Sequence, residues 1–134
     1  MSFEPIHLVL PLPPSVNAYL GHSRFGVYLT KAGREFNELV AVAVAQQLPG
    51  HCPLYGPLRI DMVVWLKDWR SDEDNRVKPA RDALEHAGVL ANDRQFCTSS
   101  CKRYYDKAFP RAEVIISEET DPEAIAVWQM GPDA

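Results

Sequence analysis

Alternating apolar and polar positions predict two β-strands in the first half of the chain. Residues 6–10, "IHLVL", form an apolar run that "PLPPS" closes, because proline cannot donate a hydrogen bond to a β-ladder. In residues 56–68, "GPLRIDMVVWLKD", apolar side chains recur at every second position from Ile60 to Leu66. This period of two predicts a strand with one face buried against a core.

A helical spacing predicts two longer helices. Thr30 is a typical N-cap for a helix over residues 31–48, which Pro49 and Gly50 would end. A second helix follows the acidic residues 72–74 and ends at Gly88. If Asp74 capped it, Pro79 would fall in the second turn, so either the helix begins nearer Val77–Lys78 or its first turn is distorted.

The remaining segments give weaker patterns. Residues 15–30 read as a loop with a short strand at 27–29, and residues 98–107 and 111–117 read as a β-hairpin. Asp121 and Pro122 are a typical cap and first residue of a final short helix. The order β-α-β-α-β-β predicts an α+β fold with helices packed on one face of a mixed sheet.

Composition places this fold in one compact domain. The chain has 134 residues, 46% of them hydrophobic and 24% charged, as is usual for a soluble protein. Its apolar runs are too short to span a membrane, and its start is unlike a signal peptide, so we expect a cytoplasmic protein. For Cys52, Cys97 and Cys101, idle thiols are favoured over half of a zinc site.

Charge is distributed unevenly along the chain. The net charge of −4 argues against a nucleic-acid partner, but residues 112–134 contain six acidic residues and no Lys or Arg. Residues 67–111 contain ten basic and eight acidic residues, so the distribution is compatible with a local basic surface. We therefore expect one domain over residues 1–118 and an acidic tail over residues 119–134.

Three adjacent carboxylates, Asp72, Glu73 and Asp74, precede the second helix. They are compatible with a solvated acidic turn that favours the helix dipole. Lys78 lies four residues after Asp74, and Asp93 lies beyond the helix. Two or three carboxylates around Mg²⁺ with a nearby lysine are a common arrangement for phosphodiester hydrolysis. Spacing alone leaves both interpretations open.

The stretch "DEDNRVKPARDAL…GVLANDRQ" resembles the RusA family of Holliday-junction resolvases. The family pattern is D-x-D-N-x-x-K-x-x-x-D-A-L, followed by G-(hydrophobic)-x-x-D-D-x-Q. The family's N-terminal P-P-S-x-N signature is also present, in "PPSVNAYL". The resemblance covers roughly residues 6–117 and leaves the acidic tail outside.

This resemblance implies a homodimeric, Mg²⁺-dependent endonuclease, with Mn²⁺ as a substitute, that nicks two opposed strands of four-way junction DNA symmetrically. Such an enzyme acts in DNA recombination and repair. The resemblance carries over Asp72, Asp74 and Asp93 as metal-binding catalytic carboxylates and Lys78 as the catalytic lysine. Asp82 matches the pattern too, and we expect a structural or supporting role for it.

Further residues are candidates for contact with DNA. Basic and amide side chains near the metal would neutralise or bind the phosphate backbone, although a solvated surface charge is at least as plausible for each one alone. These candidates are Asn17, Arg70, Asn75, Arg76, Arg81, Lys102, Arg103 and Lys107. Trp65, Trp69, Tyr104 and Tyr105 are able to stack on bases, but packing within the protein is favoured for them.

Two alternatives remain beside junction resolution. A metal-dependent nuclease on the same scaffold would cut flaps or other branched DNA. A junction-binding protein without cleavage would have no reason to keep the aspartates and Lys78 together, and that argues against it.

Overall fold

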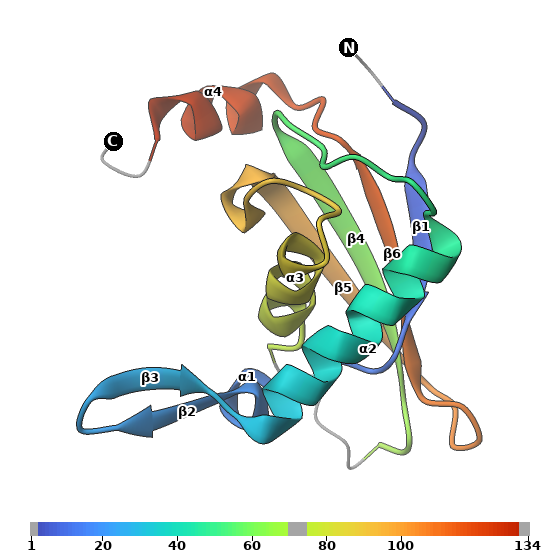
Figure 1. The fold of residues 1–134 in the computed structure, drawn as a ribbon. Coiled ribbons are helices and arrows are strands. Elements are labelled where there is room, and N and C mark those ends of the chain that lie inside the picture. Colours follow the sequence, from blue (N-terminus) through green and yellow to red (C-terminus); the bar gives the residue numbers. More distant parts are fainter. Residues whose placement is uncertain (1–2, 70–74, 132–134) are drawn as a thin grey trace.

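A four-stranded mixed sheet forms the centre of the protein (Figure 1). The structure, a computed structural model, describes residues 3–69 and 75–131. The strand order is β1-β6-β4-β5, with β4 parallel to β5 and antiparallel to β6. The strands are β1 (Ile6–Leu10), β4 (Leu58–Leu66), β5 (Phe96–Tyr105) and β6 (Arg111–Glu118). The predicted α+β class and mixed sheet are confirmed.

The predicted hairpin between residues 98–107 and 111–117 is wrong, because β4 lies between β5 and β6. Every second residue of β4, from Leu58 to Leu66, is buried, and the residues between them are half-buried, which is compatible with a strand that has a neighbour on each side. The connection over residues 106–110 is long enough to cross it. Asp106 shapes that connection by accepting from the backbone N–H groups of Ala108 and Phe109, both at 3.1 Å.

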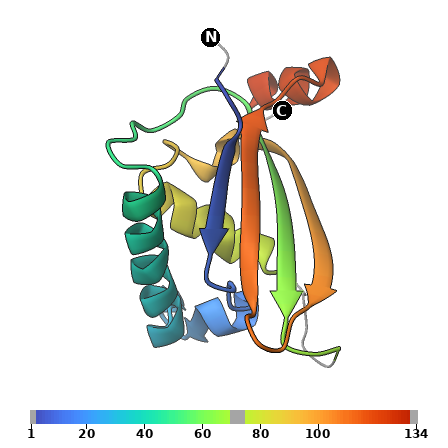
Figure 2. The same cartoon turned by 90° about the vertical axis from the view of Figure 1, so that its right-hand side faces the viewer.

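Helices α2 (Lys31–Gln47) and α3 (Val77–His86) lie on the same side of the sheet, as predicted (Figure 2). The Thr30 hydroxyl accepts from the Gly33 N–H at 3.0 Å and caps α2 at the expected residue. The apolar side of each helix meets the buried side of the strands, so the core lies between the two layers. The largest fully buried side chains there include Val40, Ile60, Met62 and Leu84.

Helix α3 begins at Val77, which answers the question raised by Pro79. Pro79 lies in the first turn, where a backbone N–H has no partner within the helix, so its missing N–H costs no hydrogen bond. At the other end, Gly88 has a φ of 82°, and the N–H of Val89 donates to the Leu84 carbonyl at 3.0 Å. This left-handed residue ends the helix where the sequence predicted.

The segment between β1 and α2 is more regular than predicted. It contains a short helix, α1 (Val16–Tyr19), and a hairpin of β2 (Leu20–Ser23) and β3 (Gly26–Leu29). A four-residue helix is too short to show a period in the sequence. Its position follows from Tyr19, which is 2% exposed and donates from its hydroxyl to Asn37 at 3.2 Å.

The chain ends in α4 (Pro122–Met130), capped as predicted by Asp121, which accepts from the Glu123 N–H at 3.0 Å. Glu119, the first residue of the expected tail, is buried and accepts from the Thr98 hydroxyl. The boundary between residues 118 and 119 stays a prediction. No helix in the described ranges is long and apolar enough to cross a bilayer.

Candidate active site

The turn after α3 holds Asp93 at a fixed place. Asp93 opens the short 3₁₀ turn η1 (Asp93–Gln95), and the Asn92 side chain accepts from the Arg94 N–H at 2.9 Å. The Gln95 side chain accepts in return from the Asn92 N–H at 2.7 Å. This reciprocal cap uses the side chain of Asn92, the residue that stands where the family pattern has an additional aspartate.

Gln95 also ties this turn to the rest of the protein. Its buried side-chain amide donates to the carbonyls of Leu54 and Gly56, both at 3.0 Å. All three hydrogen bonds of the amide therefore go to backbone groups, and a buried amide that is fully bonded fixes its neighbours. The glutamine of the family pattern is thus a structural residue, which positions Asp93.

The carboxyl groups of Asp82, on α3, and Asp93, on η1, are hydrogen-bonded to each other. The ammonium of Lys78 lies 3.9 Å from the carboxylate of Asp82, one turn along the same helix. Burial and the bond with Asp93 raise the pKa of Asp82 to about 6, although Lys78 acts in the opposite direction. A carboxyl group whose pKa is raised in this way, with a second carboxyl and a lysine beside it, is typical of functional sites.

Helix α3 also holds the backbone of Asp93. The Glu85 side chain accepts from the Asp93 N–H at 2.6 Å, and the Arg81 guanidinium donates to the Asp93 carbonyl at 2.8 Å. The Arg81 guanidinium also lies 5.4 Å from the centre of the Phe96 ring. Arg81 therefore has a clear role within the protein, and its predicted contact with DNA stays a prediction.

Two of the predicted carboxylates, Asp72 and Asp74, lie outside the described residues, as does Arg70. Among the residues that are described, no three His, Cys, Asp or Glu side chains are grouped closely enough to hold a metal ion. Asp82 and Asp93 nevertheless provide carboxylate oxygens, the ligands that Mg²⁺ prefers. The pKa of Asp82 is raised first by burial, and a bound cation would compensate the charge of the buried pair.

The supporting role expected for Asp82 stays a prediction, to which the structure adds the contacts of Asp82 with Lys78 and Asp93. The position of Asp82 four residues after Lys78 is visible in the sequence, and both lie on the polar side of α3. The sequence does not predict that the η1 turn lies beside this helix and brings Asp93 next to Asp82. The pairing depends on tertiary structure and not on spacing.

The other candidates for DNA contact lie in several places. Asn17, on α1, and Asn75, which precedes α3 with a φ of 48°, are both exposed. The Arg76 side chain donates to the Pro13 carbonyl and so joins the start of α3 to the N-terminal signature. Lys102 and Arg103 are exposed on β5, and Lys107 is exposed in the turn that follows.

The aromatic candidates divide into two groups. Trp65 and Tyr104 stack on each other with ring centres 5.9 Å apart, and the Arg111 guanidinium lies 4.1 Å from the centre of the Trp65 ring. Packing within the protein, favoured from the sequence, thus engages both rings, although Tyr104 is still 50% exposed. Trp69 and Tyr105 are exposed, at 74% and 49%.

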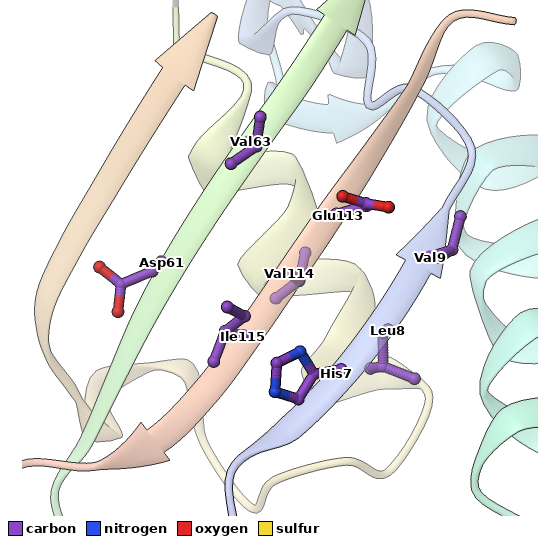
Figure 3. A pocket seen from close by; sticks show the side chains of 8 residues that line it. All are labelled: His7, Leu8, Val9, Asp61, Val63, Glu113, Val114 and Ile115. Carbon is purple, nitrogen blue, oxygen red and sulfur yellow. The ribbon is translucent and has the colours of Figure 1, made fainter.

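A hollow of about 240 Å³ lies on the opposite face of the sheet, over β1, β4 and β6 (Figure 3). Asp61 is its most strongly bonded polar side chain, because Arg59 donates to it at 2.9 Å and Ser100 at 2.6 Å. The bond from Arg59 lowers the pKa of Asp61. Since the hollow lies on the face that α3 does not cover, it is separate from Asp82 and Asp93.

Known proteins are similar to this chain over the segment that contains these residues. A family model described as "Endodeoxyribonuclease RusA" matches residues 11–117, which include all of α3 and η1. The chain belongs to the RusA family. A "Crossover junction endodeoxyribonuclease rusA" from Enterobacteria phage HK97 is 34% identical over 89 residues, covering 66% of this chain and 73% of that protein. The resemblance drawn from the sequence is confirmed, and this RusA-family chain is an endodeoxyribonuclease.

Proposed function

We propose that this chain resolves Holliday junctions by paired, symmetric nicks and requires a divalent metal ion. The observation that carries the proposal is the hydrogen-bonded pair of Asp82 and Asp93 beside Lys78, within the segment that the RusA model matches. The HK97 relative is named as a crossover junction nuclease, which supports a four-way junction as the substrate.

The carboxylates fit a hard divalent cation. Asp93 and Asp82 bring two acidic groups together at the cost of a raised pKa, an arrangement that a cation would stabilise. Asp72 and Asp74, in the matched pattern, would complete the ligand set with Asp93. Mg²⁺, with Mn²⁺ as a substitute, would neutralise phosphate charge and lower the pKa of an attacking water molecule when bound.

The chain's own residues bind and orient the substrate. Lys78 has an exposed ammonium group, which stabilises negative charge on a phosphate oxygen near the carboxylates. Asp82 positions both Lys78 and the Asp93 carboxyl, and Glu85 and Arg81 fix the Asp93 backbone. Rigid support of this kind keeps the reacting groups in the geometry that hydrolysis needs.

Paired nicks on opposed strands require two active sites, so we propose that two copies of this chain act together as a homodimer. A two-fold arrangement of sites matches the symmetry of a four-way junction. The reaction places the enzyme in DNA recombination and repair, in the cytoplasm where the DNA substrate is found.

A cleavage assay on three labelled substrates tests this function. The substrates are a synthetic four-way junction, a flap and a linear duplex of the same sequence, each with Mg²⁺ and with EDTA. We expect paired nicks in the junction with Mg²⁺ only. Equal cutting of the flap would favour a broader branched-DNA nuclease, and junction binding without cleavage in Mg²⁺ or Mn²⁺ would overturn the proposal.

A further inference from the structure

The β2–β3 hairpin extends from α1 away from the body of the protein (Figure 1). Its two-residue turn is Arg24–Phe25, and the Ser23 hydroxyl oxygen accepts from the Phe25 N–H at 3.1 Å. The Phe25 side chain is 85% exposed, the largest exposed fraction among the large hydrophobic residues described. A tight turn thus holds an apolar ring in solvent, where burial against a partner would be favourable.

Arg24 adds a positive charge beside this ring. Its guanidinium lies 4.8 Å from the centre of the Phe25 ring, within the range of a cation–π interaction. An aromatic face stacks on nucleic-acid bases, and a guanidinium binds phosphate. The tip therefore combines the two groups that proteins use to bind unpaired or exposed bases in DNA.

The surrounding charge favours a polyanion as the partner. Residues 5–34 contain Arg24, Lys31 and Arg34 and no Asp or Glu, whereas the six acidic residues of 112–134 lie in β6 and the C-terminal segment. Lys31 lies 3.9 Å from Glu35, and Arg34 donates to the Leu29 carbonyl at 3.0 Å. Arg24 is thus the cation of this segment that projects with the hairpin, and an acidic protein surface is less suited to it than DNA with its exposed bases.

The root of the hairpin lies beside the active-site helix. The Thr30 hydroxyl donates to the Ala18 carbonyl at 2.6 Å, and the Thr30 N–H donates to the Tyr19 carbonyl at 3.0 Å. Helix α1 packs against α3. Burial, together with the negative charge of Asp82, raises the pKa of the Tyr19 hydroxyl at the end of α1. A strand of four residues spans about 13 Å, so the tip stands roughly that far from a root at α1, the element that packs against α3.

The two strands of the hairpin pack closely on each other at Gly21. The Tyr28 ring lies directly over it, and a Cβ at this position would come 2.3 Å from Tyr28 Cζ. The two strands are therefore packed on each other near the root, while the tip is exposed. A protrusion with a fixed root and an exposed tip is suited to entering a gap in the substrate.

We propose that this hairpin recognises the branch point of the DNA junction, with Phe25 stacking on a base at the branch and Arg24 binding a neighbouring phosphate. The central base pairs of an open junction each expose a face that lacks a stacked neighbour, which a linear duplex does not offer. Phe25 and Arg24 are specificity-determining and not catalytic residues. This inference rests on the proposed junction substrate.

Binding to fluorescent DNA in EDTA tests the inference without cleavage. We expect Phe25→Ala to weaken binding to a four-way junction about 10- to 100-fold while changing binding to a linear duplex less than about 3-fold. Phe25→Trp should keep junction binding, since its ring also stacks. Arg24→Ala should weaken both complexes and reduce the salt dependence by about one phosphate contact.

Tyr55→Ala is the matched control. Tyr55 is an aromatic residue with 77% exposure in the α2–β4 connection. Figure 1 shows that this connection reaches β4 at the end of the sheet remote from the hairpin. If the wild-type protein prefers the junction and Phe25→Ala binds the junction equally tightly, the inference is overturned and the proposed function stays intact. Equal loss on junction and duplex would overturn branch recognition. A changed oligomeric mass of Phe25→Ala would show a contact between subunits instead and would also overturn it.

If the wild-type protein does not prefer the junction over the duplex, the proposed function fails first. The hairpin inference fails in a different way: the wild-type protein prefers the junction over the duplex, and Phe25→Ala keeps the same preference. The two proposals thus have different failing outcomes in one experiment.

Discussion

The Asp82 carboxyl is hydrogen-bonded to that of Asp93, although one lies in the middle of α3 and the other begins the turn beyond it. Two adjacent carboxylates repel each other unless a proton or a cation lies between them. The pair therefore costs stability in the metal-free protein at neutral pH. Proteins tolerate such a cost chiefly at functional sites.

The first prediction concerns pH. The pKa of Asp82 is about 6 in the folded protein, and an aspartate in an unfolded chain has a pKa of about 3.9. The folded state therefore binds the proton more tightly, and the stability gained from it is complete below about pH 4 and lost as pH rises through 6. Thermal unfolding in EDTA between pH 4 and pH 8 measures this decline.

Asp82→Asn should remove this part of the pH dependence and raise the melting temperature of the metal-free protein at pH 7.5. Glu38→Gln, which removes an exposed carboxylate on α2, should leave the wild-type decline unchanged. An Asp82→Asn curve with the same slope as wild type would show that the pair carries no strain.

Gln95 should be essential for stability because all of its amide bonds go to buried or backbone partners. Gln95→Ala leaves the Leu54 and Gly56 carbonyls and the Asn92 N–H without these partners, so we expect a loss of about 2–4 kcal/mol in the free energy of unfolding. Urea denaturation measures it. Gln46→Ala, at an exposed site on α2, is the control. A loss as small as that of the control would contradict the structural role.

Two C-terminal truncations should distinguish the contribution of Glu119 to stability from that of α4. A chain ending at Asp121 loses the Trp128 indole bond to the Arg94 carbonyl, and we expect a cost of about 1 kcal/mol with cleavage retained. A chain ending at Glu118 also loses the buried Glu119, and we expect a further cost of about 1–3 kcal/mol. Unfolding curves of the two proteins measure the difference. Equal stability of the two truncated proteins would show that Glu119 contributes nothing to the folded domain and belongs to the tail.

Local signals were enough to predict much of the fold. The caps at Thr30 and Asp121 and the end of α3 at Gly88 depend on neighbouring residues only, and the structure has all of them. The order of the strands was not predictable in this way. Whether β6 pairs with β5 or with β4 depends on which strand is hydrogen-bonded to a neighbour along both of its edges. The turn at Asp106 is compatible with either pairing.

The site shows the same division. The family pattern identified Lys78 and Asp93, and the structure adds the contact between Asp93 and Asp82. That contact depends on the path of the chain through Gly88 and on the anchoring of Gln95 to the segment before β4. A spacing rule within one helix does not contain this information. The exposed tip at Phe25 was missed because a loop was expected there.

The most direct measurement is the rate at which the wild-type protein and Asp93→Asn cleave a synthetic four-way junction with Mg²⁺. Asn at this position keeps the size of the side chain and removes the charge that a cation needs. We predict that cleavage falls roughly a thousandfold, since metal-assisted catalysis contributes several kcal/mol, while junction binding changes less than about threefold. Wild-type cleavage by Asp93→Asn, with both proteins folded, would contradict the assignment of this site.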